Sequence, residues 1–327
     1  MSVRSQRFQR IRYNAIYAFT ILMLLSILSL IAVESARANE MGSIKVEKIF
    51  QSPTEPPAGD AVLITLIPKA KAKKITGTFY NKKVVFFKKD KKSNTFYALL
   101  ATDVNAKEKS VNLKYAIDFL SGVTAGFEYD VKVKSVEYPE EKLTVAKKMV
   151  EPPKEVSSRI KAEQELVQKI YKDIKGVPLF NTEFVMPLNT KISSTYGKRR
   201  ILNGIKKSPH SGIDMKGNIG KPVKATNSGT VVLAQALYFS GNTVIVDHGL
   251  GLFSLYFHLD KTTKSVGEDV EKGDTIGTVG MTGRATGPHL HFSFKLNGLF
   301  VNPLSVISLA KDMYQPDGVV ANDDAKK

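Results

Sequence analysis

All five histidines of the 327-residue sequence lie between His210 and His291, and four of them form a pattern with Asp214. The pattern opens with His210-x-x-x-Asp214 and closes with His289-x-His291, and His258 stands between the two. Residues two apart on a strand point to the same face, so His289 and His291 can both reach one pocket. Two imidazoles and one carboxylate supply three metal ligands and leave a fourth position for water, which is the arrangement of a catalytic zinc site.

The pattern contains more imidazoles than a site with three protein ligands needs, so one or more of them can act in proton transfer. One member of the His-x-His pair can bind a metal while the other stays free, and His258 on an adjacent strand would complete a pair of imidazoles beside the bound water. Imidazole has to carry the proton, because the sequence has no His-Glu-x-x-His motif with its glutamate base. The fifth histidine, His248, precedes Gly249 in a predicted turn, and we expect no chemical role for it.

The motifs and their order resemble the lysostaphin-type, or LytM-domain, metallopeptidases. The resemblance covers residues 184–303 and rests on three motifs and the runs that flank them: His210-Ser-Gly-Ile-Asp214, His258-Leu259 and His289-Leu290-His291. It implies a Zn²⁺ ion held by His210, Asp214 and His291, with His258 and His289 as the catalytic pair. It also implies a small antiparallel β-domain with a groove that contains the metal.

The resemblance further implies a substrate, which is peptidoglycan. The order of modules is similar to that of Gram-negative envelope enzymes, so we expect a DD-endopeptidase that hydrolyses D-alanine–diaminopimelate cross-links, with removal of terminal D-alanine as the next activity. A non-catalytic activator of cell-wall amidases is the alternative from another class, although such proteins have lost zinc ligands that this sequence keeps. A latent enzyme, whose groove is covered by a loop from residues 39–180, is a third alternative.

Four further residues are predicted to bind substrate in the groove. Arg199 and Arg200 could hold a carboxylate of the peptide in a bidentate manner. Tyr256 lies two residues before His258 and is expected on the same strand face, as part of the groove wall. Asn203 lies in the loop before His210, and it is also our candidate for occlusion of the metal in a latent form.

The apolar pattern predicts a mainly β chain of two modules joined by a helix. Alternating segments separated by turn residues predict an immunoglobulin-like β-sandwich at 39–150. Glu151-Pro152-Pro153 marks a boundary, and a helical stripe follows in the linker 151–180. The peptidase domain is expected at 181–308, with a hairpin around residues 248–251, and a polar tail at 309–327. The stripe comprises Ile160, Leu166, Val167, Ile170, Tyr171 and Ile174.

The N-terminal 38 residues predict export. Four arginines precede an apolar run at 15–33, and Ser35-Ala36-Arg37-Ala38 then offers a signal-peptidase site. We expect cleavage after Ala38 and residence in the periplasm or cell envelope, with an uncleaved anchor in the inner membrane as the open alternative. Cysteine is absent, so disulfides are excluded and any metal site must use His, Asp or Glu.

The chain is strongly basic, with a formal charge of +17. Residues 1–38 contain five Arg and one Glu, so their removal lowers the charge by four, to +13. This charge favours polyanionic envelope polymers or anionic lipid as neighbours, and export excludes nucleic acid as a partner. The lysines between Lys69 and Lys92 fit either a solvated hairpin or a polyanion-binding patch.

Overall fold

Short strands dominate the described part of the chain, as the alternation of apolar and polar residues predicts. The computed structural model describes residues 46–314, so the predicted signal segment 1–38 lies outside the described residues. Every site discussed below lies within residues 48–67 and 71–314, which belong to one compact unit. Among the described residues, no helix is both long and apolar enough to cross a membrane.

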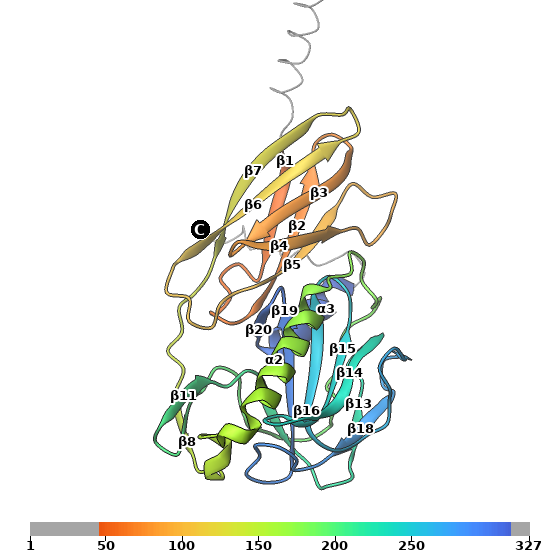
Figure 1. Ribbon diagram of the computed structural model, residues 1–327. Coiled ribbons are helices and arrows are strands. Elements are labelled where there is room, and N and C mark those ends of the chain that lie inside the picture. Colours follow the sequence, from red (N-terminus) through yellow and green to blue (C-terminus); the bar gives the residue numbers. More distant parts are fainter. Residues whose placement is uncertain (1–45, 315–327) are drawn as a thin grey trace, which may run out of the picture. The chain divides into compact units, whose positions relative to one another are not determined.

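The N-terminal module is a seven-stranded sheet with the order β1-β2-β5-β4-β3-β6-β7 (Figure 1). Strand β4 pairs with both β5 and β3, so the hydrogen bonds form one continuous path. Alternate side chains are fully buried, among them Ile64, Leu66 and Leu113. The antiparallel β prediction is confirmed, whereas the immunoglobulin-like sandwich is not. The strands are β1 (Val46–Ser52), β2 (Ala61–Pro68), β3 (Ala72–Phe79), β4 (Lys82–Phe87), β5 (Phe96–Ala101), β6 (Ser110–Phe119) and β7 (Thr124–Lys132).

The segment that follows the module contributes a strand to a separate small sheet. Strand β8 (Glu140–Leu143) runs parallel to β10 (Arg199–Leu202), whose other edge pairs with β11 (Lys206–Pro209). In this register Glu141 lies opposite Arg200. Two short 3₁₀ segments, η1 (Lys147–Met149) and η2 (Lys154–Val156), then lead to helix α2 (Ser157–Lys172).

The C-terminal domain is built on a ten-stranded sheet with the order β17-β14-β15-β16-β19-β12-β9, to which β13, β18 and β20 attach. Strands β15 and β16 form the predicted hairpin, with Asp247 opposite Phe253. Helix α3 (Pro303–Tyr314) runs across the predicted domain limit at 308. The strands are β9 (Ile192–Ser194), β12 (Ile213–Lys216), β13 (Pro222–Lys224), β14 (Gly229–Leu237), β15 (Gly241–Asp247), β16 (Leu252–Thr262), β17 (Asp269–Val270), β18 (Thr275–Val279), β19 (His289–Leu296) and β20 (Leu299–Val301).

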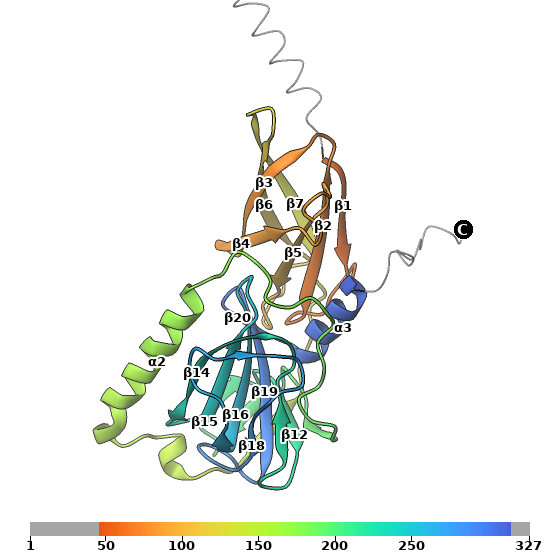
Figure 2. The ribbon, with the colours of Figure 1, turned by 90° about the vertical axis from the view of Figure 1, so that its right-hand side faces the viewer.

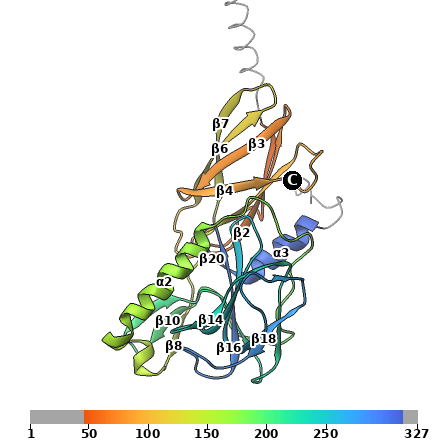
Figure 3. The same ribbon diagram turned by 45° about the vertical axis from the view of Figure 1, so that its right-hand side comes forward.

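Helix α2 packs on this domain with one apolar stripe. The ring of Tyr171 meets that of Phe253 edge-on, with 5.3 Å between centroids, and Val167 and Ile170 join the same cluster. Figures 2 and 3 show the helix alongside β14. Leu166, which was expected in the stripe, is 39% exposed and lies outside the contact. The helix therefore belongs to the C-terminal domain's core through its second half.

Replacement of Tyr171 by alanine should destabilise the C-terminal domain, because it removes a buried ring and leaves a cavity against Phe253. We expect a loss of about 3 kcal/mol, as for other large aromatic truncations. The midpoint of denaturant unfolding measures it, with Leu166→Ala on the same helix as the matched control. Equal shifts for the two variants would contradict the packing described here.

Candidate active site

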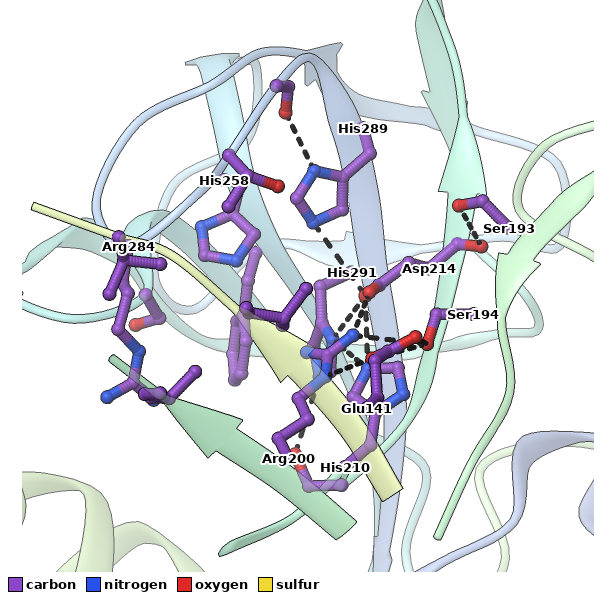
Figure 4. A pocket seen from close by; sticks show the side chains of 18 of the residues that line it. Glu141, Ser193, Ser194, Arg200, His210, Asp214, His258, Arg284, His289 and His291 are labelled. Atoms are coloured by element: carbon purple, nitrogen blue, oxygen red, sulfur yellow. Dashed lines mark hydrogen bonds and ion pairs between the residues drawn. The ribbon is translucent and has the colours of Figure 1, made fainter. Parts of the chain in front are cut away.

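Strands β12 and β19 bring three ligand atoms together at one point. Asp214 and His291 are direct partners across the two strands, and His210 lies in the loop before β12. His210 Nε2 lies 3.1 Å from Asp214 Oδ1 and 3.0 Å from His291 Nδ1, and His291 Nδ1 lies 2.8 Å from the same Oδ1 (Figure 4). The three atoms fit within 4.8 Å of one another and can hold a metal ion. The loop therefore folds back as the His-x-x-x-Asp spacing predicts.

Hydrogen bonds from the outer ring nitrogens orient both ligand histidines. The Nδ1 atom of His210 lies 2.7 Å from the carbonyl oxygen of Thr195, which can only accept, so Nδ1 carries the proton and Nε2 has a free lone pair. His291 Nε2 lies 2.7 Å from Ser293 Oγ, which leaves His291 Nδ1 for the metal. Such outer partners are typical of metal-binding histidines. The donor set and its orientation thus fit a divalent metal.

Arg200 fixes the carboxylate of Asp214. Its Nη2 binds Asp214 Oδ2, so that only Oδ1 faces the two histidines. The Nε of Arg200 donates to Glu141 Oε2 over 2.9 Å, so strand β8 holds the arginine in turn. Burial alone would raise the pKa of Asp214, but the contacts of its Oδ1 with the His210 and His291 side chains hold that pKa well below its usual range. The carboxylate is therefore ionised and ready to bind a cation.

Two further imidazoles lie next to the ligands. His258 Nδ1 lies 2.8 Å from the carbonyl oxygen of Thr282, and His289 Nδ1 lies 2.8 Å from that of Gly287, so in the neutral tautomer of each ring the proton is on Nδ1 and the lone pair on Nε2. Their centroids are 5.0 Å apart, and His289 Nε2 is 3.7 Å from Asp214 Oδ1. Burial, reinforced by the neighbouring histidines, lowers the pKa of His258 to about 3. At neutral pH His258 is therefore uncharged.

A bulge in β16 turns His258 toward the ligands. Tyr256 pairs with Val244 but Leu259 pairs with Asn242, so one extra residue is inserted between these pairs. His258 takes the left-handed conformation, with φ of 62°. As a result, the consecutive residues Phe257 and His258 both line the pocket.

The bulge overturns the prediction for Tyr256. Its ring is fully buried on the opposite face, where the hydroxyl accepts a hydrogen bond from the Thr226 N–H over 2.9 Å. Regular alternation would have placed Tyr256 and His258 on one face, but the inserted residue reverses the side. Phe257 takes the wall position instead, and its ring stacks on His291 with 5.3 Å between centroids.

Two other predicted substrate residues are engaged elsewhere. Arg199 donates to Asn105 Oδ1 over 2.7 Å and does not line the pocket. The Asn203 side chain makes two 2.9 Å hydrogen bonds with the backbone of Val145, so it neither lines the pocket nor occludes the metal ligands. Arg200 lines the pocket, but Glu141 and Asp214 already occupy its guanidinium.

The pocket around these residues has a volume of about 400 Å³. One wall comes from the segment after the N-terminal module, through Glu141, Leu143 and Val145. Sequence reasoning missed this wall, because β8 pairs with a strand nearly sixty residues further along the chain and no motif marks it. It also missed Arg284, which lies in the run Gly280–Pro288 just before His289 and lines the pocket.

His248 lies outside the site, in the core beneath the β15–β16 hairpin. Its Nδ1 lies 2.7 Å from the carbonyl oxygen of Ser228 and its Nε2 lies 2.8 Å from Ser254 Oγ. Burial lowers the pKa of His248 to about 4. Its contacts are those of a buried structural residue, in keeping with the expectation of no chemical role.

Acidification should therefore destabilise the fold through His248. The unfolded chain takes up this proton near pH 6.5 and the folded chain only near pH 4, so the contribution is complete above pH 6.5 and is lost as pH falls toward 4. At pH 5 the loss should be about 2 kcal/mol. Thermal unfolding from pH 7 to 4.5 measures it, and His248→Gln should flatten this part of the profile. An unchanged slope in the variant would refute the assignment.

Comparison with known proteins agrees with the geometry. Residues 208–303 match the profile described as peptidase family M23. The peptidoglycan DD-endopeptidase ShyC of Vibrio cholerae is 37% identical over 139 residues, which are 42% of this chain and 32% of that protein. The DD-carboxypeptidase/endopeptidase Mpg of Neisseria meningitidis is 39% identical over 130 residues, which are 39% of this chain and 30% of that protein. The chain thus spans about a third of the length of these curated relatives.

A solved structure is similar over a longer range. A crystal structure of an M23 peptidase candidate from Pseudomonas aeruginosa has a TM-score of 0.59 and 25% identity, and the match covers 79% of this chain and 96% of that one. It extends well beyond residues 208–303, so the fold is shared outside the catalytic motifs. The profile match contains all four motif histidines and Asp214, so residues 208–303 of this chain match a domain of peptidase family M23.

Proposed function

We propose that this chain is an exported zinc metallo-endopeptidase that hydrolyses the peptide cross-links of peptidoglycan. The observation that carries the proposal is the convergence of His210, Asp214 and His291 beside two further imidazoles, those of His258 and His289. A site with three protein ligands and free imidazoles nearby is built for hydrolysis rather than for a structural metal. The name of the Vibrio relative, a peptidoglycan DD-endopeptidase, supports peptidoglycan as the substrate.

In this mechanism His210 Nε2, His291 Nδ1 and Asp214 Oδ1 would hold the zinc ion. The chemistry that bound zinc supplies is polarisation of the scissile carbonyl and a lower pKa for a water molecule. The chain's own part is proton transfer: an unprotonated Nε2 of His258 or His289 accepts the proton of the attacking water, and the resulting imidazolium delivers it to the leaving amine. The Thr282 and Gly287 carbonyls hold the two rings in the tautomer that this requires.

For the bond itself we propose the D-alanine–diaminopimelate cross-link, cut by DD-endopeptidase activity. Carboxypeptidase trimming is the alternative activity on the same substrate, and the Neisseria relative is named for both. We further propose that the protein acts in the periplasm or cell envelope, either free or anchored by its N-terminal segment. Its positive net charge would attract it to the anionic polymers of the envelope. The complete ligand set argues against a purely activating role.

One observation favours a restrained resting state as a second candidate. The segment 139–149 borders the pocket and is tied to both of its sides. On one side Asn203 binds Val145 twice, and on the other the Tyr238 hydroxyl donates to the Lys148 carbonyl over 3.0 Å. In this reading the segment limits entry of the bulky wall polymer, and the enzyme is latent until the segment moves.

Digestion of purified cross-linked sacculi tests the main proposal. The zinc-loaded chain should convert cross-linked dimers to monomers, as seen by mass analysis of the fragments, and a chelator should abolish this. His291→Ala should lose both the bound zinc, measured by elemental analysis, and the activity, because it removes a ligand. Intact dimers in the presence of one bound zinc per wild-type chain would count against an active endopeptidase.

Replacement of His258 by alanine separates proton transfer from metal binding. Zinc content should stay at the wild-type level, since His258 is not among the ligands, while kcat should fall by about 10²- to 10⁴-fold. Turnover at the wild-type rate with zinc bound would show that the histidine has no role in the reaction.

Replacement of Asn203 by alanine tests the restrained state. The variant loses both hydrogen bonds to Val145 while every ligand stays in place. Faster cleavage of sacculi than by the wild type, at equal zinc content, is expected if the segment limits access. An unchanged or lower rate would leave β8 with a structural role only.

A further inference from the structure

Arg284 reaches the pocket from the loop that precedes His289. The loop is fixed at this point, because the Arg284 N–H donates to the Phe239 carbonyl over 2.8 Å. The guanidinium lies 5.0 Å from the centre of the Phe239 ring, and its one hydrogen bond to a described residue is a long one, 3.5 Å from Nη1 to the Met149 carbonyl. The next residue, Ser240, accepts a hydrogen bond from the His258 N–H at its carbonyl oxygen. The same short segment, Phe239-Ser240, thus contacts both Arg284 and His258, which places Arg284 on the side of the catalytic pair.

The charges of the pocket do not balance around this arginine. Two carboxylates line the pocket, Glu141 and Asp214, and both are bound to Arg200. Within residues 46–314, no carboxylate lies within ion-pair distance of Arg284. Burial, with a further contribution from the positive charge of Arg200, lowers the pKa of Arg284. A half-buried guanidinium is thus held beside a second cation with no anion to offset it.

A partly buried cation without a partner costs free energy in the empty pocket. An anion that binds next to it would offset this cost. The guanidinium offers a rigid, planar set of N–H donors that matches a carboxylate, and the Phe239 ring limits its orientation. Figure 4 shows Arg284 at the edge of the pocket, away from the metal ligands, so a bound carboxylate would lie beside the scissile bond rather than on the metal.

We propose that Arg284 binds a free carboxylate of the peptide substrate and thereby selects peptides in which that group is not amidated. The proposal rests on the proposed function for its substrate, and it names Arg284 in the role that the sequence assigned to Arg199 and Arg200. Arg199 is bound to Asn105, and Arg200 is bound to Glu141 and Asp214. Both guanidinium groups therefore already have partners within the protein. Since the carboxylate takes no part in bond making or breaking, it contributes to binding more than to the chemical step.

The test compares two cross-linked peptide dimers that differ only in the diaminopimelate carboxyl next to the scissile bond, free in one and amidated in the other. The zinc-loaded full chain should cleave the free form with a kcat/KM about 10- to 100-fold higher, mainly through KM. Arg284→Gln should erase this preference, and Arg284→Lys should keep part of it, because the charge remains without the planar fork.

Arg159→Gln is the matched control. Arg159 also lies over an aromatic ring, that of Tyr238 at 5.9 Å, but it sits on the exposed surface of α2 and does not line the pocket. This variant should retain the full preference for the free form. The thermal unfolding temperature of each variant shows that the fold is intact.

Binding of the same two peptides by calorimetry separates this proposal from the proposed function. If the wild type cleaves neither peptide, the endopeptidase proposal fails, yet tighter binding of the free form that is lost in Arg284→Gln would still support the carboxylate site. Equal binding of both forms by the wild type, no binding of either, or a preference that persists in Arg284→Gln would overturn it.

Discussion

The geometry of the site depends on the two oxygens of Asp214 having different partners. Oδ1 faces His210 and His291, while Oδ2 is held by Arg200. Without the arginine the carboxylate could rotate or bind a metal through both oxygens, and the three ligand atoms would no longer converge in one way. Arg200 is in turn fixed by Glu141, which Lys198 and Ser194 also bind. A single metal ligand is therefore supported by a network that begins in the segment after the N-terminal module.

One face of the sheet carries both a candidate metal ligand, His291, and the two imidazoles of the proposed catalytic pair. His289 and His291 share the face of β19 by simple alternation, and the antiparallel partner β12 places Asp214 beside them. His258 joins the same face only because β16 carries an extra residue and a left-handed backbone conformation at that point. Local backbone strain of this kind is tolerated where the surrounding structure holds it, and it is commonly found at functional sites. Burial lowers the pKa of His258 and of His291, so these two rings are uncharged at neutral pH.

Much of this site could be predicted because strand periodicity acts over short distances. The spacing of His210 and Asp214, the His-x-His pair and the β15–β16 hairpin are local features, and each is confirmed. Tyr256 was misplaced because a bulge leaves no mark on the alternation of residue types. Glu141 and Arg284 were missed because their roles depend on contacts with strands far along the chain. The helix α2 was recognised from its period, but Leu166 showed that a stripe of apolar residues can be wider than the contact it makes.

The parallel pairing of β8 with β10 also bears on where the working unit of this protein begins. A fragment cut at the limits of the family match, 208–303, would keep every histidine of the chain and Asp214. It would nevertheless lack Thr195, which orients His210, as well as Arg200 and Glu141. A recombinant fragment or a natural fusion limited to the matched residues would thus contain the candidate ligands. It would lack the residues that hold those ligands in position. The contacts that hold the candidate ligands in place therefore extend upstream of the family match, to Glu141.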